Sequence, residues 1–166
     1  YDEKEEVQKS NELLEWQFEK YNEIDDDLEC SGCLARISLN YRKIDKPDMA
    51  LPKLHLALDF AKKTADTNFT LLIQTYIAEA LYELEKYQES DDLVDKLISS
   101  FDLLNIKKTL LDIKLLKLQI QWMTNSNERE VIESIKELSL QIVWDDQEAV
   151  EQRIRFEQTI INCMEH

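Results

Sequence analysis

Two cysteines stand three positions apart in the stretch Cys30-Ser31-Gly32-Cys33, which holds the only glycine of the chain. Thiols at this spacing form a redox-active dithiol in some proteins and half of a zinc site in others. A redox dithiol needs a thioredoxin-like setting of strands and helices, which this sequence does not predict. We expect Cys30 and Cys33 to be small residues near the start of a helix, with a metal or redox role as the alternative.

A zinc site with four ligands would need a second pair, and the C-terminus offers Cys163 and His166. Packed helices lie roughly 8–10 Å apart, so a stack of helical hairpins would separate the two pairs widely. The sequence therefore predicts no metal site within one chain, and a site shared between molecules is the remaining alternative.

The rest of the sequence predicts no catalytic centre. His55 stands between Leu54 and Leu56 and is expected on the surface of a helix, or partly buried, rather than as a general base. The acidic run from Ile24 to Glu29 lacks the ligand spacing and central glycine of an EF-hand loop, so we expect a solvated linker. The sequence has no serine–histidine–aspartate arrangement and no glycine-rich phosphate loop. We expect a non-enzymatic protein without cofactors.

The composition predicts an all-α fold. The chain has one glycine and two prolines in 166 residues, whereas sheets joined by tight turns need several residues with positive φ. The formal charge is −15, and residues 1–30 carry 12 acidic side chains against 3 basic ones. This sign opposes binding to nucleic acids and to anionic membranes. Besides a simple solvated surface, the alternative is an acidic face that steers a basic partner.

The sequence also bears on location. No apolar run approaches the roughly 20 residues of a membrane span, and the start YDEKEEVQKS does not resemble a signal peptide. Three cysteines are too few for a disulfide scaffold and favour a reducing compartment. We expect an intracellular, cytoplasmic protein.

Apolar residues recur with the helical period of 3.6 along most of the chain. Asn68 is expected to cap one helix, Pro47 to begin another, and Pro52 to delay or kink that helix. The tryptophans share this spacing with other apolar residues, so we expect three in the core: Trp16, Trp122 and Trp144. The predicted helices span about 3–24, 32–44, 48–65, 68–85, 87–104, 108–124, 128–143 and 146–165.

Two stretches 40 residues apart share a pattern, RISLNYRKIDKPDMA (residues 36–50) and YIAEALYELEKYQES (residues 76–90). Small residues recur at matching positions, Ser38 with Ala78 and Ala50 with Ser90, where they would let two helices approach closely. A third and more degenerate match follows 41 residues later, with Val131 in the place of Ser90. This period is the span of a helix–turn–helix unit, so the sequence predicts repeated helical hairpins.

At these residues the sequence resembles the tetratricopeptide-repeat (TPR) superfamily. The stretch LYELEKYQES (residues 81–90) looks like the turn of a TPR motif, with Tyr87 as the turn aromatic and Ser90 at the small position. The chain departs from the family by its longer units and by the absence of glycine at Ser38 and Ala78. The stretch NFTLLIQTYIAEALYELEKYQESDDLV and the later LLDIKLLKLQIQW are also similar to the helical-repeat arms of proteasome-lid and signalosome subunits.

The resemblance implies a right-handed α-solenoid of about three TPR-like hairpins with a flanking helix at each end. The chain would form a single domain over residues 1–166. Its repeat units would span about 31–67, 71–105 and 112–145, with extra helices at about 3–24 and 146–165.

The resemblance also implies a binding site, because the first helix of each TPR hairpin lines the concave face. Here that face would be an apolar groove with a charged rim. It departs from the TPR pattern that clamps a chaperone's carboxylate, which needs Lys and Asn where Ala35 and Leu39 stand. The inward-facing residues would be Ala35, Leu39, Arg42, Lys43, Leu72, Thr75, Glu79, Tyr82, Glu83, Ile113, Leu116, Ile120 and Met123.

We expect a scaffold that binds a peptide, a helix or a subunit of a larger assembly through the concave face or the open ends. One alternative is a peptide-sensing regulatory module of a bacterial regulator. Another is that the same residues simply form the intramolecular core.

Overall fold

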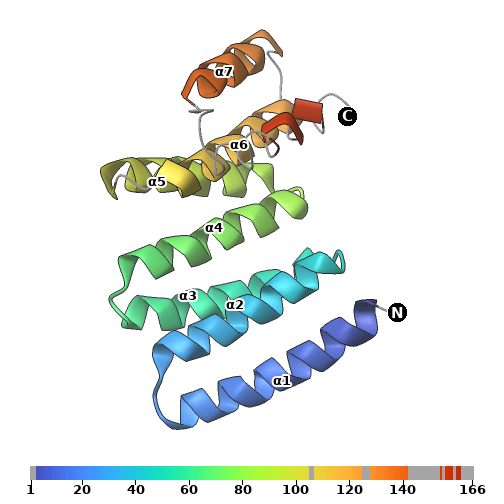
Figure 1. Ribbon diagram of the computed structural model, residues 1–166, viewed down its shortest axis with the longest axis vertical. Coiled ribbons are helices and arrows are strands. Elements are labelled where there is room, and N and C mark those ends of the chain that lie inside the picture. Colours follow the sequence, from blue (N-terminus) through green and yellow to red (C-terminus); the bar gives the residue numbers. More distant parts are fainter. Residues whose placement is uncertain are drawn as a thin grey trace. The chain divides into compact units, whose positions relative to one another are not determined.

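The structure is a computed structural model that describes residues 3–104, 107–124, 128–141, 154, 156–158 and 160–161. All secondary-structure elements in this part of the chain are α-helices, which confirms the predicted all-α class (Figure 1). The helices are α1 (Glu3–Glu23), α2 (Asp27–Lys43), α3 (Pro47–Lys63), α4 (Thr67–Glu83), α5 (Tyr87–Leu104), α6 (Lys107–Thr124) and α7 (Glu128–Gln141).

The chain divides into two compact units, residues 1–93 and 94–166, and the division falls inside α5. Each unit is described by itself below. The predicted single domain over residues 1–166 stays a prediction.

The helices of the first unit follow one another at a constant interval. α2, α3 and α4 each have 17 residues, and three-residue connections join them. The middle residue of each connection has a positive φ of 55° to 58°, at Asp25, Asp45, Ala65 and Glu85, which stand 20 residues apart. None of them is glycine, although the left-handed region costs other residues free energy.

Hydrogen bonds at the helix ends stabilise this conformation. After α2, Lys46 N–H donates to the carbonyl of Tyr41, and Asp45 N–H donates to that of Arg42. After α4, Lys86 and Glu85 donate in the same way to Leu81 and Tyr82. This is the Schellman arrangement, in which the chain reverses after one left-handed residue.

Aspartates cap the first helix of each hairpin in this unit. Asp26 accepts a hydrogen bond from Glu29 N–H at 3.1 Å, and Asp66 accepts one from Phe69 N–H at 3.0 Å. The predicted cap at Asn68 is therefore wrong, because α4 already begins at Thr67. The acidic run at 24–29 is a connection plus a cap rather than a linker alone.

The prolines of α3 meet only part of the expectation. Pro47 is the first residue of the helix, as predicted. Pro52 lies inside the helix, so the predicted late start is wrong.

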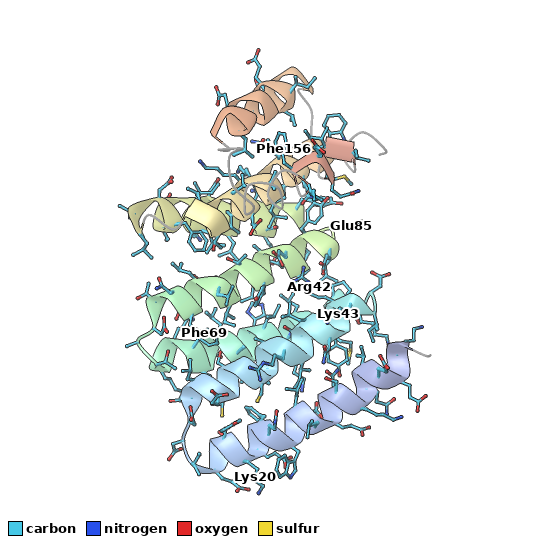
Figure 2. All side chains as sticks on the ribbon, viewed as in Figure 1. Lys20, Arg42, Lys43, Phe69, Glu85 and Phe156 are labelled. Atoms are coloured by element: carbon cyan, nitrogen blue, oxygen red, sulfur yellow. The ribbon has the colours of Figure 1, made fainter. Side chains whose placement is uncertain are left out.

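The core of the first unit lies among α2, α3 and α4, which pack in succession. Phe69 at the start of α4 packs against this core (Figure 2). The buried residues of the core are Leu34, Ala35, Leu54, Ala57, Ala61, Ile73, Ile77, Ala80 and Leu81.

The predicted small residues lie where helices meet. Ser38, Ala50, Ala78 and Ser90 are all 0 % exposed. Ser90 Oγ donates to the carbonyl of Ala78 at 2.7 Å, which joins the two predicted small positions of that hairpin directly. The expectation of a close approach there is confirmed.

α3 and α5 match in burial over Pro47–Lys63 and Tyr87–Leu103. Each residue of one helix has the same degree of exposure as the residue 40 positions along in the other. Ala50, Leu54 and Ala57 correspond in this way to the buried Ser90, Val94 and Leu97. α3 and α5 therefore repeat the same burial pattern at the 40-residue interval found in the sequence.

The core of the second unit joins α6 to α7. The predicted apolar stripe of α6 is confirmed, because Leu111, Leu115 and Leu118 are buried and Trp122 packs against them. Val131 and Leu138 of α7 and Phe156 complete the core. Most of the last predicted helix, at about 146–165, lies outside the described residues.

The prediction that all three tryptophans are core residues is wrong for Trp16. This side chain is 56 % exposed. It lies about half a helical turn away from the stripe of α1 that packs on α2, so the helical period places it in solvent. Trp144 lies outside the described residues.

Gly32 occupies the interior of α2 without a steric need for glycine. A Cβ built at this position meets no atom within 4 Å, and its φ is not positive. We expect Gly32→Ala to raise the free energy of unfolding by about 0.4–1 kcal/mol, because alanine loses less backbone entropy on folding. Urea denaturation of the two proteins measures this, and a loss of stability would show that the position requires glycine.

Candidate functional site

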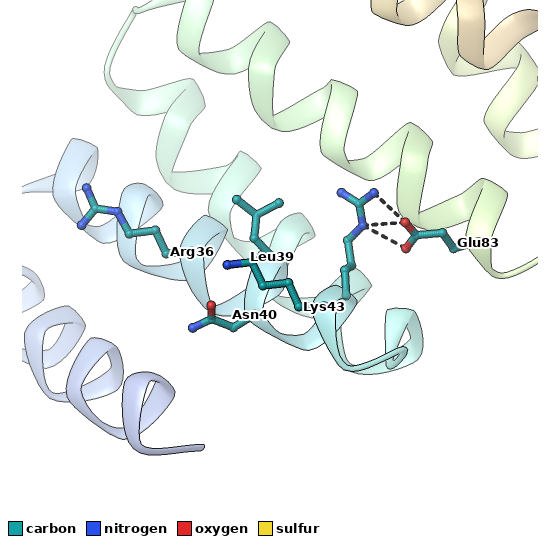
Figure 3. A pocket seen from close by; sticks show the side chains of 6 residues that line it. Arg36, Leu39, Asn40, Lys43 and Glu83 are labelled. Carbon is teal, nitrogen blue, oxygen red and sulfur yellow. Dashed lines mark hydrogen bonds and ion pairs between the residues drawn. The ribbon is translucent and has the colours of Figure 1, made fainter. Parts of the chain in front are cut away.

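An open depression of about 470 Å³ lies on α2, next to the end of α4. Figure 3 shows its lining residues. We call it the α2 depression, and it is lined by Arg36, Leu39, Asn40, Arg42, Lys43 and Glu83. Five of the six belong to α2, at positions that share one helical face or border it.

Arg42 links α2 to α4 through two carboxylates. Its Nη1 lies 2.7 Å from Glu79, and its Nε and Nη2 both bind Glu83, with Nη2 at 2.6 Å. Burial by itself lowers the pKa of Arg42, but the hydrogen bond to Glu83 and the charge of Glu79 outweigh it, so the pKa is raised. Arg42 is therefore a fixed cation whose charge is balanced within the protein.

Arg36 and Lys43 differ from Arg42, because no ion pair joins either of them to a carboxylate in the described part of the chain. Both side chains are exposed at the depression. Asn40 lies between them and is held by α1, since its Nδ2 donates to Asn11 Oδ1 at 2.8 Å and to Ser10 Oγ at 3.0 Å. These two hydrogen bonds, donated by the amide nitrogen, also fix the orientation of the amide oxygen of Asn40.

The predicted site residues of the first unit lie in different surroundings. Leu39, Arg42 and Lys43 line the depression, and Glu79 and Glu83 hold Arg42 in place. Leu72 is 36 % exposed, and Tyr82 is half-buried with its ring 5.6 Å from that of Tyr87.

Ala35 and Thr75 are not available to a ligand. They are 6 % and 4 % exposed, and the Thr75 hydroxyl donates to the carbonyl of Leu71 in its own helix. Their assignment to an open groove is wrong, because the buried stripe of each helix passes through them. The depression on α2 carries three cationic side chains, Arg36, Arg42 and Lys43, around Leu39.

The predicted groove residues of the second unit are also mostly buried. Ile113, Leu116 and Ile120 are 1 %, 6 % and 1 % exposed. Met123 is 41 % exposed and remains on the surface. The open groove predicted across α6 is therefore wrong, and the alternative of intramolecular burial applies to these three residues.

Sequence reasoning missed Arg36 and Asn40. Arg36 stands one position after the predicted residue Ala35, and Asn40 stands one position after the predicted residue Leu39. The spacing of Arg36, Asn40 and Lys43 places them on one helical face, between apolar residues that point elsewhere. This polar stripe was the signal that could have identified the depression.

The two cysteines of α2 are buried near its start, as expected, each 1 % exposed. Burial raises the pKa of both thiols, and the nearby carboxylate of Asp27 raises that of Cys30 further. No group of three or more potential metal ligands occurs among the described residues. Cys163 and His166, the other predicted pair, lie outside them.

We expect the buried thiols to be unreactive in the folded protein. In a Cys163→Ser background, Cys30 and Cys33 should react with a disulfide reagent about a hundredfold or more slowly than in denaturant, because the thiolate forms rarely and the helix must open first. The absorbance of the thiolate that the reagent releases measures the reaction rate. Fast reaction without denaturant would show that the two thiols are accessible to the reagent. That result would favour the alternative of a redox role for Cys30 and Cys33.

His55 is exposed, which agrees with its predicted surface position. Among the described residues, no helix combines the length and apolarity needed to cross a membrane. Comparisons with protein-family models, with curated proteins and with solved structures found no match to this chain.

Proposed function

We propose that the protein is a non-catalytic interaction scaffold whose α2 depression binds an acidic segment of a partner protein. One observation supports this most: two exposed cations without an ion pair, Arg36 and Lys43, flank an open depression of a chain whose net charge is −15. An acidic partner segment would supply the carboxylates that these cations lack.

The other lining residues define the chemistry of this segment. Leu39 offers a small apolar surface between the cations, and the oxygen of Asn40 can accept a hydrogen bond from a peptide N–H. Arg42 has its charge balanced by Glu79 and Glu83, so it contributes mainly shape. The segment that fits is a peptide with one apolar side chain between acidic residues.

We further propose that the scaffold is a right-handed α-solenoid of TPR-like hairpins. The equal helix lengths, the three-residue connections and the matching burial of α3 and α5 support a hairpin repeat of 40 residues. In such a repeat α2 and α4 are first helices, the helices that line the binding face in the TPR superfamily.

A fluorescein-labelled peptide with a central leucine between aspartates and glutamates tests the binding site. We expect saturable binding by fluorescence anisotropy, at least about tenfold weaker for Arg36→Glu/Lys43→Glu, since like charges at a binding surface oppose association. Binding should also weaken as salt is raised.

The matched control is Lys62→Glu/Lys96→Glu, which changes the net charge equally at exposed lysines outside the depression. This variant should bind the peptide within about twofold of the unmodified protein. Equal loss in both variants would mean that binding follows net charge, and no loss in either would place the peptide elsewhere. Both results would refute the proposed site.

A further inference from the structure

α1 has one packed face and one open face. Val7, Asn11 and Leu14 are buried on the first, which packs against α2. Leu13 and Trp16 are 57 % and 56 % exposed. At 3.6 residues per turn they lie about a third and a half of a turn away from the packed stripe. Two large apolar side chains are therefore exposed side by side on this helix.

Leu13 is the centre of a regular stripe. Glu6, Ser10, Leu13, Gln17 and Lys20 are spaced four, three, four and three residues apart, which keeps them on one helical face. We call this the α1 stripe. Lys20 points away from α2 (Figure 2), and Glu6, Ser10 and Lys20 are exposed.

The corresponding stripes of α3 and α5 are buried at two positions each, Ala50 with Ala57 and Ser90 with Leu97. With the 40-residue period, Ser10 corresponds to Ala50 and Ser90, which are both 0 % exposed. The covering helix is the preceding one in each case: Ser31 of α2 donates to the carbonyl of Ala57, and Ser90 donates to that of Ala78 in α4. The α1 stripe thus has the small residue and the spacing that receive a helix at the equivalent positions.

The charges of the α1 stripe match those of a second, antiparallel copy of itself. Glu6 and Lys20 each stand seven residues from Leu13, about 10 Å along the helix in opposite directions. If two copies of α1 meet antiparallel with their Leu13 side chains at the twofold axis, Glu6 of each copy faces Lys20 of the other. Ser10, the small residue, then faces Trp16.

We propose that a second copy of the chain covers the α1 stripe and forms an isologous antiparallel dimer about Leu13. The ion pair that Lys20 forms with Glu23, at 2.7 Å, is no obstacle, because its side chains are 50 % and 62 % exposed and such pairs contribute little. A contact through one helix is small, so the dimer is reversible and forms as concentration rises.

Sedimentation velocity of the full chain over a range of concentrations tests this proposal. We expect a concentration-dependent dimer whose dissociation constant rises at least about tenfold for Leu13→Glu. Lys20→Glu should weaken the dimer as well, because Glu6 would then face a carboxylate. The charge swap Glu6→Lys/Lys20→Glu should restore it, since the pairing across the axis is re-formed with reversed sign.

Met49→Glu is the matched control for Leu13→Glu, because Met49 is a 46 % exposed apolar residue of α3. This variant should dimerise like the unmodified chain, and circular dichroism should show all variants equally helical. A chain that stays monomeric at every concentration overturns the proposal. A dimer that is unaffected by Leu13→Glu also overturns it, because another surface would then form the contact. Failure of the charge swap to restore the dimer overturns it as well, because the two helices would then meet in another register.

Discussion

Replacing Leu54 by alanine is expected to lower the free energy of unfolding by about 2–5 kcal/mol. Leu54 is 0 % exposed in the core of the first unit and has Ala57 and Ala61 on the same face of α3. Truncation removes buried apolar surface and leaves a cavity that these small neighbours cannot fill. Urea denaturation followed by circular dichroism measures the change.

Leu56→Ala is the control for this prediction, because it makes the same chemical change two residues further along α3. Leu56 is 42 % exposed, so its truncation should change stability by roughly 0.5 kcal/mol or less. Equal effects of the two variants would contradict the placement of α3 between α2 and α4.

The second large effect is expected at Arg42, where Arg42→Gln should cost about 1–3 kcal/mol. The Arg42 side chain is 15 % exposed and joins α2 to α4 through Glu79 and Glu83, which are 32 % and 35 % exposed. Without the guanidinium, two carboxylates remain close together with no cation between them. Their partial exposure keeps the cost below that of a fully buried pair.

A double-mutant cycle isolates this interaction. The variant Arg42→Gln/Glu83→Gln should be less destabilised than the sum of its two single variants, with a coupling free energy of roughly 0.5–3 kcal/mol. Lys9→Gln is the control, because it removes an exposed ion pair to Glu5 worth about 0.5 kcal/mol or less. Zero coupling between Arg42 and Glu83 would show that the two helices are not joined at this point.

The helices and their period could be predicted from the sequence because both follow from local spacing. The small residues Ala50 and Ser90 were correctly placed, since a helix crossing imposes a volume limit that the sequence shows directly. The left-handed residues Ala65 and Glu85 could not be predicted, because alanine and glutamate are not typical of positive φ, whereas the aspartates Asp25 and Asp45 belong to a residue type enriched there. Their conformation depends on the hydrogen bonds that end each helix.

The candidate site was predicted in part. Leu39, Arg42 and Lys43 line the depression, and their role in binding stays a prediction. The pairing of Arg42 with Glu79 and Glu83 spans 37 and 41 residues, so it depends on how α2 and α4 pack and not on local spacing. Ala35 was misplaced because its burial depends on how α2 packs with α3 and α4, which local spacing does not show.

The most direct test of the proposed function is a backbone NMR titration with the acidic peptide. We predict that the largest shift changes occur at Arg36–Lys43 and Glu83, while α6 and α7 show none. Arg36→Glu/Lys43→Glu should abolish these changes at the same peptide concentration. Shift changes that fall outside the α2 depression, or that persist in this variant, would contradict the proposal that the depression binds the partner.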